Sequence, residues 1–268
     1  MNKREFLKSL LLLLHAGGFV GALARWAGAK ETVGKEGEGK APGGTDAKGE
    51  ANGKHDPARH WYGMGIEIDK CIGCSRCVDA CKVENAVPRE PFFFNTWLER
   101  YVIAKDGEAV VESINVKGKS SREMRQDDGE VIRSFFVPKL CNQCANPPCV
   151  QVCPVGATFS TKDGVVLVDA NRCIGCGYCI QACPYGARYL HPESRIAQKC
   201  FFCYHRVVQG LLPACVEVCP TQARIFGDLK SKASRLVRFT RMNKIHVLKP
   251  SLNTEPKVYY AQLDGEVR

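Results

Sequence analysis

The stretch CIGCSRCVDAC, residues 71–81, places four cysteines at intervals of three, three and four residues. A nearly identical stretch, CIGCGYCIQAC, occupies residues 173–183. The chain has 268 residues and 16 cysteines, and every cysteine belongs to one of four groups of four, here called quartets. Each quartet ends in the pattern C-x3-C, so the chain repeats one arrangement of four thiols.

The quartets are numbered in chain order. Their members are Cys71, Cys74, Cys77 and Cys81 in the first, Cys141, Cys144, Cys149 and Cys153 in the second, Cys173, Cys176, Cys179 and Cys183 in the third, and Cys200, Cys203, Cys215 and Cys219 in the fourth. A proline follows the last cysteine of the second, third and fourth quartets, whereas Lys82 follows the first. Proline fixes the backbone and removes an N–H donor at that point.

Three kinds of site use groups of cysteines. Disulfides are plausible in an exported protein, but cysteines in C-x2-C runs are poorly placed to join distant segments. Zinc sites usually pair two C-x2-C units across a spacer and do not need a third nearby cysteine. The run C-x2-C-x2-C-x3-C-P is typical of bacterial iron–sulfur proteins, in which three thiolates hold one cluster and the fourth ligates another. The spacing therefore favours iron–sulfur clusters over zinc and disulfides.

A repeated unit follows three of the quartets. The segments CPVGATF (153–159), CPYGARY (183–189) and CPTQARIF (219–226) are versions of one sequence. Between the second and third quartets, TFSTKDGVVLVDANRC (158–173) predicts a hairpin that turns at Asp163 and Gly164. We therefore expect an α+β fold built from duplicated bacterial two-cluster ferredoxin-like units.

The first sixty residues predict an export signal and a linker. Residues 1–29 have a basic start, an apolar run and the small-residue sequence AGA, which is the layout of a cleavable signal. The opening NKREFLK resembles a twin-arginine motif, with Lys3 in place of the first arginine. An uncleaved N-terminal anchor is the alternative. Residues 30–60 are rich in glycine and charge and predict a flexible linker. The expected location is periplasmic, peripheral to the inner membrane.

From about Trp61 to the end, the four quartets in this order resemble the four-cluster ferredoxin subunit of the molybdopterin oxidoreductase complexes. Examples are the iron–sulfur subunits of dimethyl sulfoxide, polysulfide and tetrathionate reductases and of formate-dependent nitrite reductase. The second quartet, C-x2-C-x4-C-x3-C-P, the fourth, C-x2-C-x11-C-x3-C-P, and the segment KPSLNTEPKVYY (249–260) carry the resemblance. It implies one domain over residues 61–268, with a β-rich insertion at 82–140 and a C-terminal helix and extended tail at 228–268.

The resemblance also implies a ligand map in which paired quartets exchange their last cysteine. It assigns Cys71, Cys74, Cys77 and Cys219 to cluster 1, Cys81, Cys200, Cys203 and Cys215 to cluster 2, Cys141, Cys144, Cys149 and Cys183 to cluster 3, and Cys153, Cys173, Cys176 and Cys179 to cluster 4. Since no quartet lacks a cysteine, four [4Fe-4S] clusters are expected.

The function that the resemblance implies is electron transfer without catalysis. The expected partners are a molybdopterin catalytic subunit and a polytopic quinone-binding membrane subunit. The alternative is the same relay in a sulfur-cycle or cytochrome-linked membrane complex without molybdopterin. An iron–sulfur enzyme with its own site would need a cluster with an open iron. No nucleotide fingerprint or haem-attachment motif occurs, so neither a substrate of its own nor a nucleic-acid partner is expected.

Several side chains next to the cysteines are candidate modifiers of the clusters. Arg76, Arg172 and Lys199 could favour the reduced state, but as exposed charges they are expected to act weakly. The formal net charge of +10 does not by itself choose among nucleic acid, an anionic membrane and an acidic partner. Aromatic residues beside the cysteines are expected to pack in the core and keep water from the clusters: Tyr178, Tyr185, Phe201 and Phe202.

Overall fold

The computed structural model describes residues 55–89, 93–105, 107–114 and 131–267. All of them belong to one compact unit, Ala47–Arg268. The predicted export signal, residues 1–29, and most of the predicted linker, residues 30–60, lie outside the described residues and stay predictions. Within the described part of the chain, no helix has both the length and the apolar character that crossing a membrane requires.

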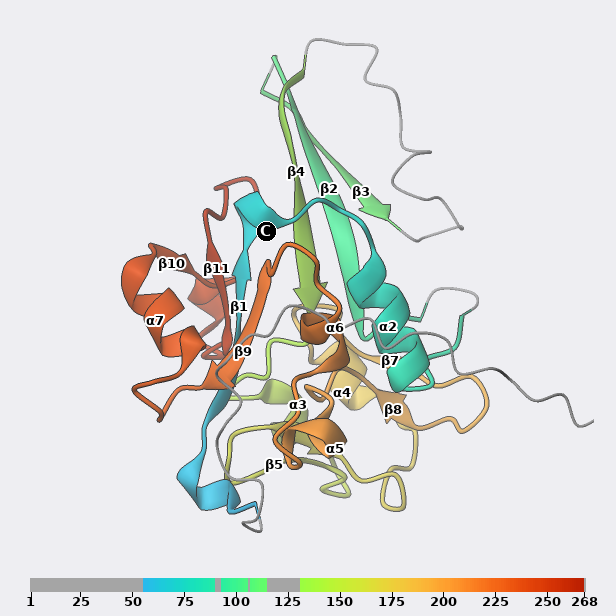
Figure 1. Ribbon diagram of the computed structural model, residues 1–268. Coiled ribbons are helices and arrows are strands. Elements are labelled where there is room, and N and C mark those ends of the chain that lie inside the picture. The colour runs from blue at the N-terminus through green and yellow to red at the C-terminus, as the bar shows by residue number, and fades with distance from the viewer. Residues whose placement is uncertain (1–54, 90–92, 106, 115–130, 268) are drawn as a thin grey trace, which may run out of the picture. The chain divides into compact units, whose positions relative to one another are not determined.

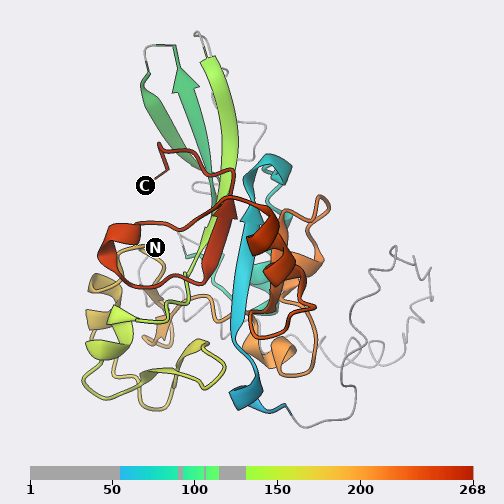
Figure 2. The same ribbon diagram turned by 90° about the vertical axis from the view of Figure 1, so that its left-hand side faces the viewer.

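A four-stranded mixed sheet, in the order β10–β11–β1–β9, joins the two ends of this unit (Figures 1 and 2). Its strands are β1 (Tyr62–Glu67), β9 (Arg224–Asp228), β10 (Ile245–His246) and β11 (Val258–Ala261). Strand β1 pairs parallel with β11 and antiparallel with β9. Five of the six residues of β1 are buried, because both neighbouring strands and the packed faces cover it.

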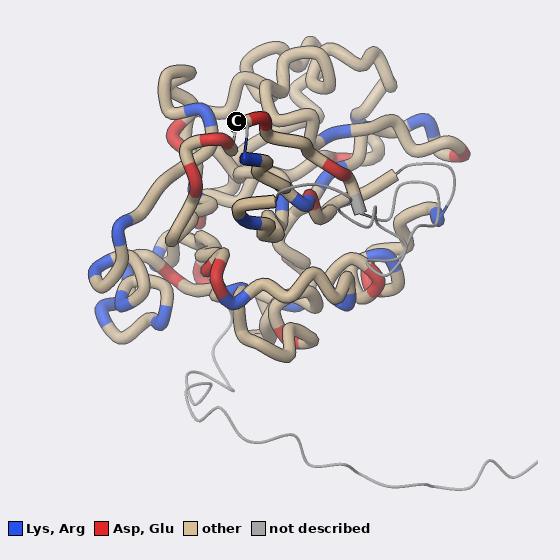
Figure 3. The backbone as a smooth tube through the Cα atoms, turned by 90° about the horizontal axis from the view of Figure 1, so that it is seen from above, with Lys and Arg blue, Asp and Glu red and all other residues tan. Residues whose placement is uncertain are grey.

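Helix α7 (Arg235–Met242) packs on this sheet and presents a basic outer side. Leu236, Val237 and Phe239 are buried, and a Cβ at Gly65 of β1 would lie 2.7 Å from the Phe239 ring. Residues 230–244 contain six Lys or Arg and no Asp or Glu, and Figure 3 shows blue segments gathered at this edge. Part of the positive net charge is therefore concentrated on α7 and its flanking turns.

A second, antiparallel sheet has the order β3–β2–β4 and projects from the rest of the unit (Figure 1). Its strands are β2 (Thr96–Ala104), β3 (Ala109–Ile114) and β4 (Val131–Leu140). All three lie within residues 82–140, where a β-rich insertion was predicted. Only one end of β4 is buried, from Val137 to Leu140. Strand β4 thus packs at the base of the sheet and is more exposed toward its tip.

Short helices and hairpins carry the quartets, as expected for ferredoxin-like units. The helices are α2 (Arg76–Glu84), α3 (Pro148–Gln151), α4 (Tyr178–Gln181), α5 (Tyr204–Val207) and α6 (Ala214–Glu217). The hairpins are β5 (Thr158–Ser160) with β6 (Val166–Val168), and β7 (Tyr189–Leu190) with β8 (Ala197–Gln198). The hairpin predicted around Asp163 and Gly164 is confirmed by the β5–β6 pairing.

The C-terminal residues pair and pack more than an extended tail would. Besides α7 and β10, they form a 3-10 turn at Pro250–Leu252 and strand β11, which lies against β1. Ahead of β11, the carbonyl groups of Thr254 and Glu255 accept hydrogen bonds from the backbone N–H groups of Asn146 and Ala145, at 3.1 and 2.8 Å. The tail therefore covers the second quartet.

Candidate iron–sulfur centres

The first group of thiols combines the first three cysteines of the first quartet with the last cysteine of the chain. Cys71, Cys74, Cys77 and Cys219 line one cavity of about 330 Å³, together with Arg224. The pKa of Cys71 is raised to about 11, mainly by burial, and negative charge at Cys77 and Cys219 acts in the same direction. These four cysteines, called set 1, come together because β9, which follows Cys219, pairs with β1, which precedes Cys71.

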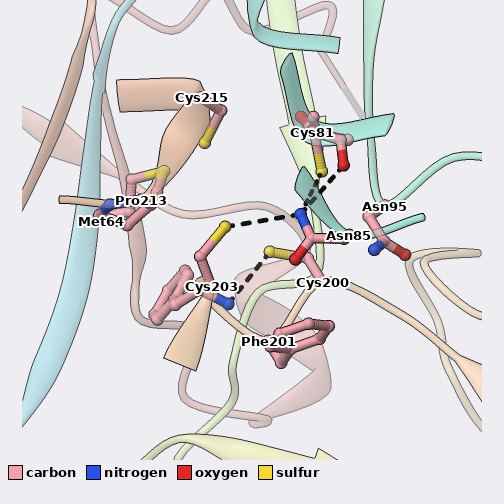
Figure 4. A pocket seen from close by; sticks show the side chains of 11 residues that line it. Met64, Cys81, Asn85, Asn95, Cys200, Phe201, Cys203, Pro213 and Cys215 are labelled. Atoms are coloured by element: carbon pink, nitrogen blue, oxygen red, sulfur yellow. Dashed lines mark hydrogen bonds between the residues drawn. The ribbon is translucent and has the colours of Figure 1, made fainter. Parts of the chain in front are cut away.

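The second group, set 2, lies deeper. Cys81, Cys200, Cys203 and Cys215 line a cavity of about 280 Å³, and their side chains face a common space in Figure 4. All four are buried, and burial raises the pKa of Cys200 well above its usual value. Helix α2 supplies Cys81, whereas the fourth quartet supplies the other three thiols.

One amide side chain lies between two thiols of set 2. The Nδ2 of Asn85 donates to the Sγ of Cys81 at 3.4 Å and to the Sγ of Cys203 at 3.5 Å (Figure 4). Asn85 therefore links the first quartet to the fourth. This residue was not predicted from the sequence, although it occupies the place that alanine has in the repeated units, four residues after the last cysteine.

The third group, set 3, combines the first three cysteines of the second quartet with Cys183. The pKa of Cys144 is raised to about 12, mainly by burial; negative charge at Cys141, Cys149 and Cys183 acts in the same direction, and a hydrogen bond with Thr254 opposes it. The four thiols are therefore close enough to interact electrostatically. Since Thr254 belongs to the C-terminal segment, the tail also contributes to this group.

The fourth group, set 4, combines the first three cysteines of the third quartet with Cys153. Cys153, Cys173, Cys176 and Cys179 line a cavity of about 300 Å³. Burial acts to raise the pKa of Cys153, but backbone N–H groups that follow it in the chain outweigh burial and lower the pKa. One of these donors is the N–H of Thr158, 3.4 Å from the sulfur. Each set has the same four members as one group of the ligand map, whose assignment to clusters stays a prediction.

The four C-x2-C loops share one backbone feature that their sequences only partly reveal. The residue before the second cysteine has positive φ in every loop: 68° at Gly73, 47° at Gln143, 68° at Gly175 and 55° at Phe202. Glycine adopts this conformation without a steric penalty, whereas other residues do so at a cost. Gln143 and Phe202 are almost fully buried, and their surroundings hold the strained backbone in place.

The donor sets suit an iron–sulfur cube. All 16 cysteines lie in the described residues, and all are free thiols, so none forms a disulfide. Buried thiolates repel one another and need a cationic group between them. Because a cube carries separate irons at its corners, its ligands surround a volume. In the described ranges, no three His, Cys, Asp or Glu side chains are grouped to hold a single metal ion.

The sets differ in their exposure and follow one another in order. Set 1 and set 4 each contain one exposed cysteine, Cys74 and Cys176, whereas sets 2 and 3 contain none. Cys215 of set 2 has Cys77 of set 1 as an electrostatic neighbour, and Cys200 of set 2 has Cys141 of set 3. Sets 3 and 4 share the neighbour Arg188. The order is therefore 1–2–3–4.

Two polar side chains join set 2 to set 3. Gln143 donates to the carbonyl oxygen of Cys200 at 2.6 Å and accepts from the N–H of Val166 at 2.7 Å. Lys199 donates to the carbonyl oxygens of Val166 and Cys200. The expectation that Lys199 is an exposed charge was wrong, because it is only 2% exposed. Burial lowers its pKa, while Cys141, Cys200 and Cys149 act in the opposite direction.

The other neighbouring side chains divide between core and surface. Phe202 is buried as expected, but Tyr178 is 57% exposed, so it does not pack in the core. Arg76 and Arg172 are exposed, as expected. Two buried arginines, Arg188 and Arg224, were not predicted from the sequence. The signal was available, since CPYGAR and CPTQAR end at these two residues.

Short helices and hairpins that bring sixteen thiols together in four sets define a ferredoxin-type iron–sulfur protein. Two family models, each described as a 4Fe-4S dicluster domain, match residues 70–157 and 132–229. Together with the 16 cysteines, these domains correspond to four [4Fe-4S] clusters.

Comparison with characterised proteins is consistent with this class. A tetrathionate reductase subunit of Salmonella typhimurium is 43% identical over 208 residues, which cover 77% of this chain and 74% of that protein. The protein of the same name from Archaeoglobus fulgidus is 44% identical and covers 76% and 83%. A polysulfide reductase chain of Wolinella succinogenes is 37% identical and covers 74% and 92%. The chain therefore belongs to this family of iron–sulfur subunits of reductase complexes.

Proposed function

We propose that the chain relays electrons between a polytopic quinone-binding membrane subunit and a molybdopterin catalytic subunit of an extracytoplasmic respiratory reductase, with no substrate site of its own. In this proposal each of the four thiol sets ligates one cluster. The sets are Cys71, Cys74, Cys77 and Cys219; Cys81, Cys200, Cys203 and Cys215; Cys141, Cys144, Cys149 and Cys183; and Cys153, Cys173, Cys176 and Cys179.

The observation that carries the relay is the order of the sets combined with their exposure. Sets 2 and 3 are enclosed, whereas sets 1 and 4 each reach the surface through one cysteine. Ile72 and Ile174, which follow the first cysteine of their loops, are 59% and 65% exposed. An electron would therefore enter at one terminal set and leave at the other, and apolar loop residues beside Cys74 and Cys176 are available to contact a partner there.

When bound, each cluster accepts and releases single electrons at a potential that its surroundings set. The protein's part is to hold the thiols, exclude water and supply hydrogen bonds to sulfur. Phe202 and Met64 are almost fully buried and line or adjoin the cavity of set 2. Asn85 donates to two of its sulfurs. The side chains around set 2 thus hold and tune a cluster, which supports a relay rather than catalysis.

The proposed partners and compartment draw on two further observations. The relatives are named as parts of tetrathionate and polysulfide reductases, so they act in assemblies with other chains. Residues 1–29 have the layout of an export signal. An extracytoplasmic complex linked to membrane quinone would use both features, with the basic face of α7 as one of the surfaces open to a partner or lipid.

The proposal is tested on the native complex, isolated anaerobically from membranes through a tag on this chain. We expect about sixteen iron and about sixteen sulfide per chain, a molybdenum-containing partner, and reduction of the clusters by an added quinol. A fully loaded chain that copurifies with cytochromes and no molybdenum would favour the relay without a molybdopterin subunit. A zinc-loaded chain without a paramagnetic signal after dithionite would refute both.

A further inference from the structure

Two buried arginines occupy matching places in the repeated units. Arg188 and Arg224 each lie five residues after the last cysteine of their quartet, at the end of the pattern C-P-x-x-A-R. They are only 5% and 3% exposed. The second quartet has Thr158 at this place and the first has Ala86. Each pair of sets that exchanges a cysteine therefore contains one such arginine.

Arg188 lies between set 3 and set 4. Its Nη2 donates to the Sγ of Cys149, which belongs to set 3, at 3.0 Å, and its Nη1 donates to the Oγ1 of Thr158 at 3.3 Å. The Arg188 side chain also has a hydrogen bond with Cys179. Because Cys179 belongs to set 4, the guanidinium interacts with thiols of both sets.

Arg224 has the same relation to sets 1 and 2. Its Nη1 lies 3.8 Å from the Sγ of Cys215 of set 2, and its Nη2 donates to the Oγ1 of Thr96 at 2.7 Å. It also lines the cavity of set 1. Burial acts to lower the pKa of Arg224, but Cys77, Cys215 and Cys71 outweigh burial and raise it. The threonine partner therefore recurs, although Thr96 comes from the insertion and Thr158 from the repeat.

Neither arginine has a conventional counter-ion. Across the described ranges, no Asp or Glu forms an ion pair with Arg188 or Arg224. The Nε of Arg224 is a buried donor without a hydrogen-bond partner in the described structure. A guanidinium remains charged in proteins, and a buried charge requires a partner of opposite sign. The remaining source of negative charge is the thiolate sets on either side.

We propose that Arg188 and Arg224 are matched electrostatic bridges, each placed between two neighbouring clusters and raising the reduction potential of both. The inference rests on the four ligand sets proposed above. A cluster becomes more negative by one charge when it gains an electron, and a nearby buried cation stabilises that state more than the oxidised one. Net charge and hydrogen bonds to sulfur are recognised determinants of cluster potential.

The bridge position also affects two clusters at once. Adjacent reduced clusters repel each other, and a cation between them offsets part of that repulsion. Each bridge would therefore make it easier for both members of its pair to be reduced. One bridge serves sets 1 and 2 and the other serves sets 3 and 4, so their effects should fall on different clusters.

The test is a potentiometric titration of the full-length, cluster-loaded chain, followed by visible absorption and paramagnetic resonance. In Arg188→Gln we expect two of the four one-electron steps to become at least about tenfold less favourable, which corresponds to about 59 mV for a one-electron step. In Arg224→Gln we expect the other two steps to shift. Arg188→Lys, which keeps the charge, should stay close to the unchanged protein.

Arg76→Gln is the matched control. It removes the same charge beside a ligand, Cys77, but at an exposed position, so the potentials should hardly move. Iron content is measured first in every variant. If Arg188→Gln loses iron while Arg188→Lys keeps both iron and potentials, the need for charge is supported, because the lysine lacks the guanidinium fork.

Three results would overturn the proposal. Unchanged potentials in fully loaded Arg188→Gln or Arg224→Gln would show that the charge does not act on the clusters. Loss of iron in both Arg188→Gln and Arg188→Lys would show that the guanidinium geometry is purely structural. Shifts of the same two steps in both glutamine variants would contradict the bridge positions. In each case a wild-type protein with about sixteen iron would leave the relay intact.

Discussion

The two pairs of thiol sets use the same parts at very different distances along the chain. Sets 3 and 4, the local pair, draw on the second and third quartets, residues 141–183. Sets 1 and 2, the long-range pair, draw on residues 71–81 and 200–219. Both pairs have loops with positive φ at the same place, and each contains one buried arginine. The cluster-binding unit is therefore local, whereas its partner unit can come from anywhere in the chain.

Different backbone elements join the two quartets of each pair. In the local pair the hairpin β5–β6 lies between the two quartets, and the N–H of Asp169 donates to the carbonyl oxygen of Ala157 at 2.8 Å. In the long-range pair β1 and β9 form the link, and the N–H of Glu67 donates to the carbonyl oxygen of Ala223 at 2.9 Å. Bringing the ends of a short connection together costs little conformational entropy. The long connection depends on the central sheet.

The largest effect should come from removing the exchanged cysteine of the long-range pair. In Cys219→Ala we expect loss of up to about four of about sixteen iron atoms, together with the signals of cluster 1. The reason is that Cys219 shares a cavity with Cys71, Cys74 and Cys77. Iron analysis and paramagnetic resonance after dithionite provide the measurement.

Cys183→Ala is the matched change in the local pair, and it should remove cluster 3 instead. Loss of the cluster held by Cys200, Cys203 and Cys215 in the Cys219→Ala protein would show that the exchanged ligand sets are wrong. That conclusion requires cluster 1 to be retained, since loss of both clusters of a pair in either variant would instead mean that the pairs assemble as units.

The next effect concerns the equivalent glycines of the first and third quartets. Alanine at either position requires positive φ, which costs about 1–2 kcal/mol. A Cβ at Gly175 would lie 2.5 Å from the backbone oxygen of Arg195, whereas a Cβ at Gly73 would meet the Phe136 ring at 2.6 Å. The ring can move more easily than the backbone. Gly175→Ala should therefore destabilise by about 2–5 kcal/mol in total.

Gly73→Ala should stay near the conformational cost alone. The rate of loss of visible cluster absorbance on anaerobic heating compares the two proteins. If Gly73→Ala loses its clusters as fast as Gly175→Ala, the contact with Phe136 at the base of the projecting sheet is as rigid as a backbone contact.

A smaller effect is expected at the junction between the pairs. Lys199→Met removes a buried charge between sets 2 and 3 and leaves the carbonyl oxygens of Val166 and Cys200 without this donor. Reduction of clusters 2 and 3 should become about tenfold less favourable, about 59 mV. The free energy of unfolding should fall by about 1–3 kcal/mol because the buried carbonyl oxygen of Val166 loses this donor, whereas Gln143 still donates to that of Cys200.

Lys199→Arg keeps the charge and serves as the control for the redox effect. Potentiometric titration of both variants, combined with heating, separates the two contributions. A shift confined to clusters 1 and 4 would place the charge of Lys199 away from the junction and contradict the order of the sets.

The smallest effect should come from Asn85→Ala. This change gives the first quartet the alanine that the other three have at the same place. It removes hydrogen bonds to the sulfurs of Cys81 and Cys203, which stabilise negative charge there. The potential of cluster 2 should fall by less than the Lys199→Met shift, and the other potentials should not change. A larger shift than at Lys199 would mean that hydrogen bonds to sulfur outweigh buried charge.

Much of the site could be predicted from cysteine spacing, because a cluster is gripped by residues close together in sequence. The hairpin around Gly164 was also readable, since alternation and turn residues are local signals. Glycine at residues 73 and 175 agrees with the positive φ found there, because glycine adopts this conformation without a steric penalty. The same conformation at Gln143 and Phe202 was not readable, because distant contacts hold it in place.

The sequence by itself determined that the chain groups its sixteen thiols in fours, repeats the unit C-P-x-x-A, and therefore binds clusters in a ferredoxin-like manner. Backbone reach over a few residues is enough to decide these features. Only the tertiary structure placed Cys219 beside Cys71, buried Lys199, and set Arg188 and Arg224 between neighbouring sets. Burial and electrostatic partnership depend on which remote segments meet, and the spacing of residues within one loop carries no record of that.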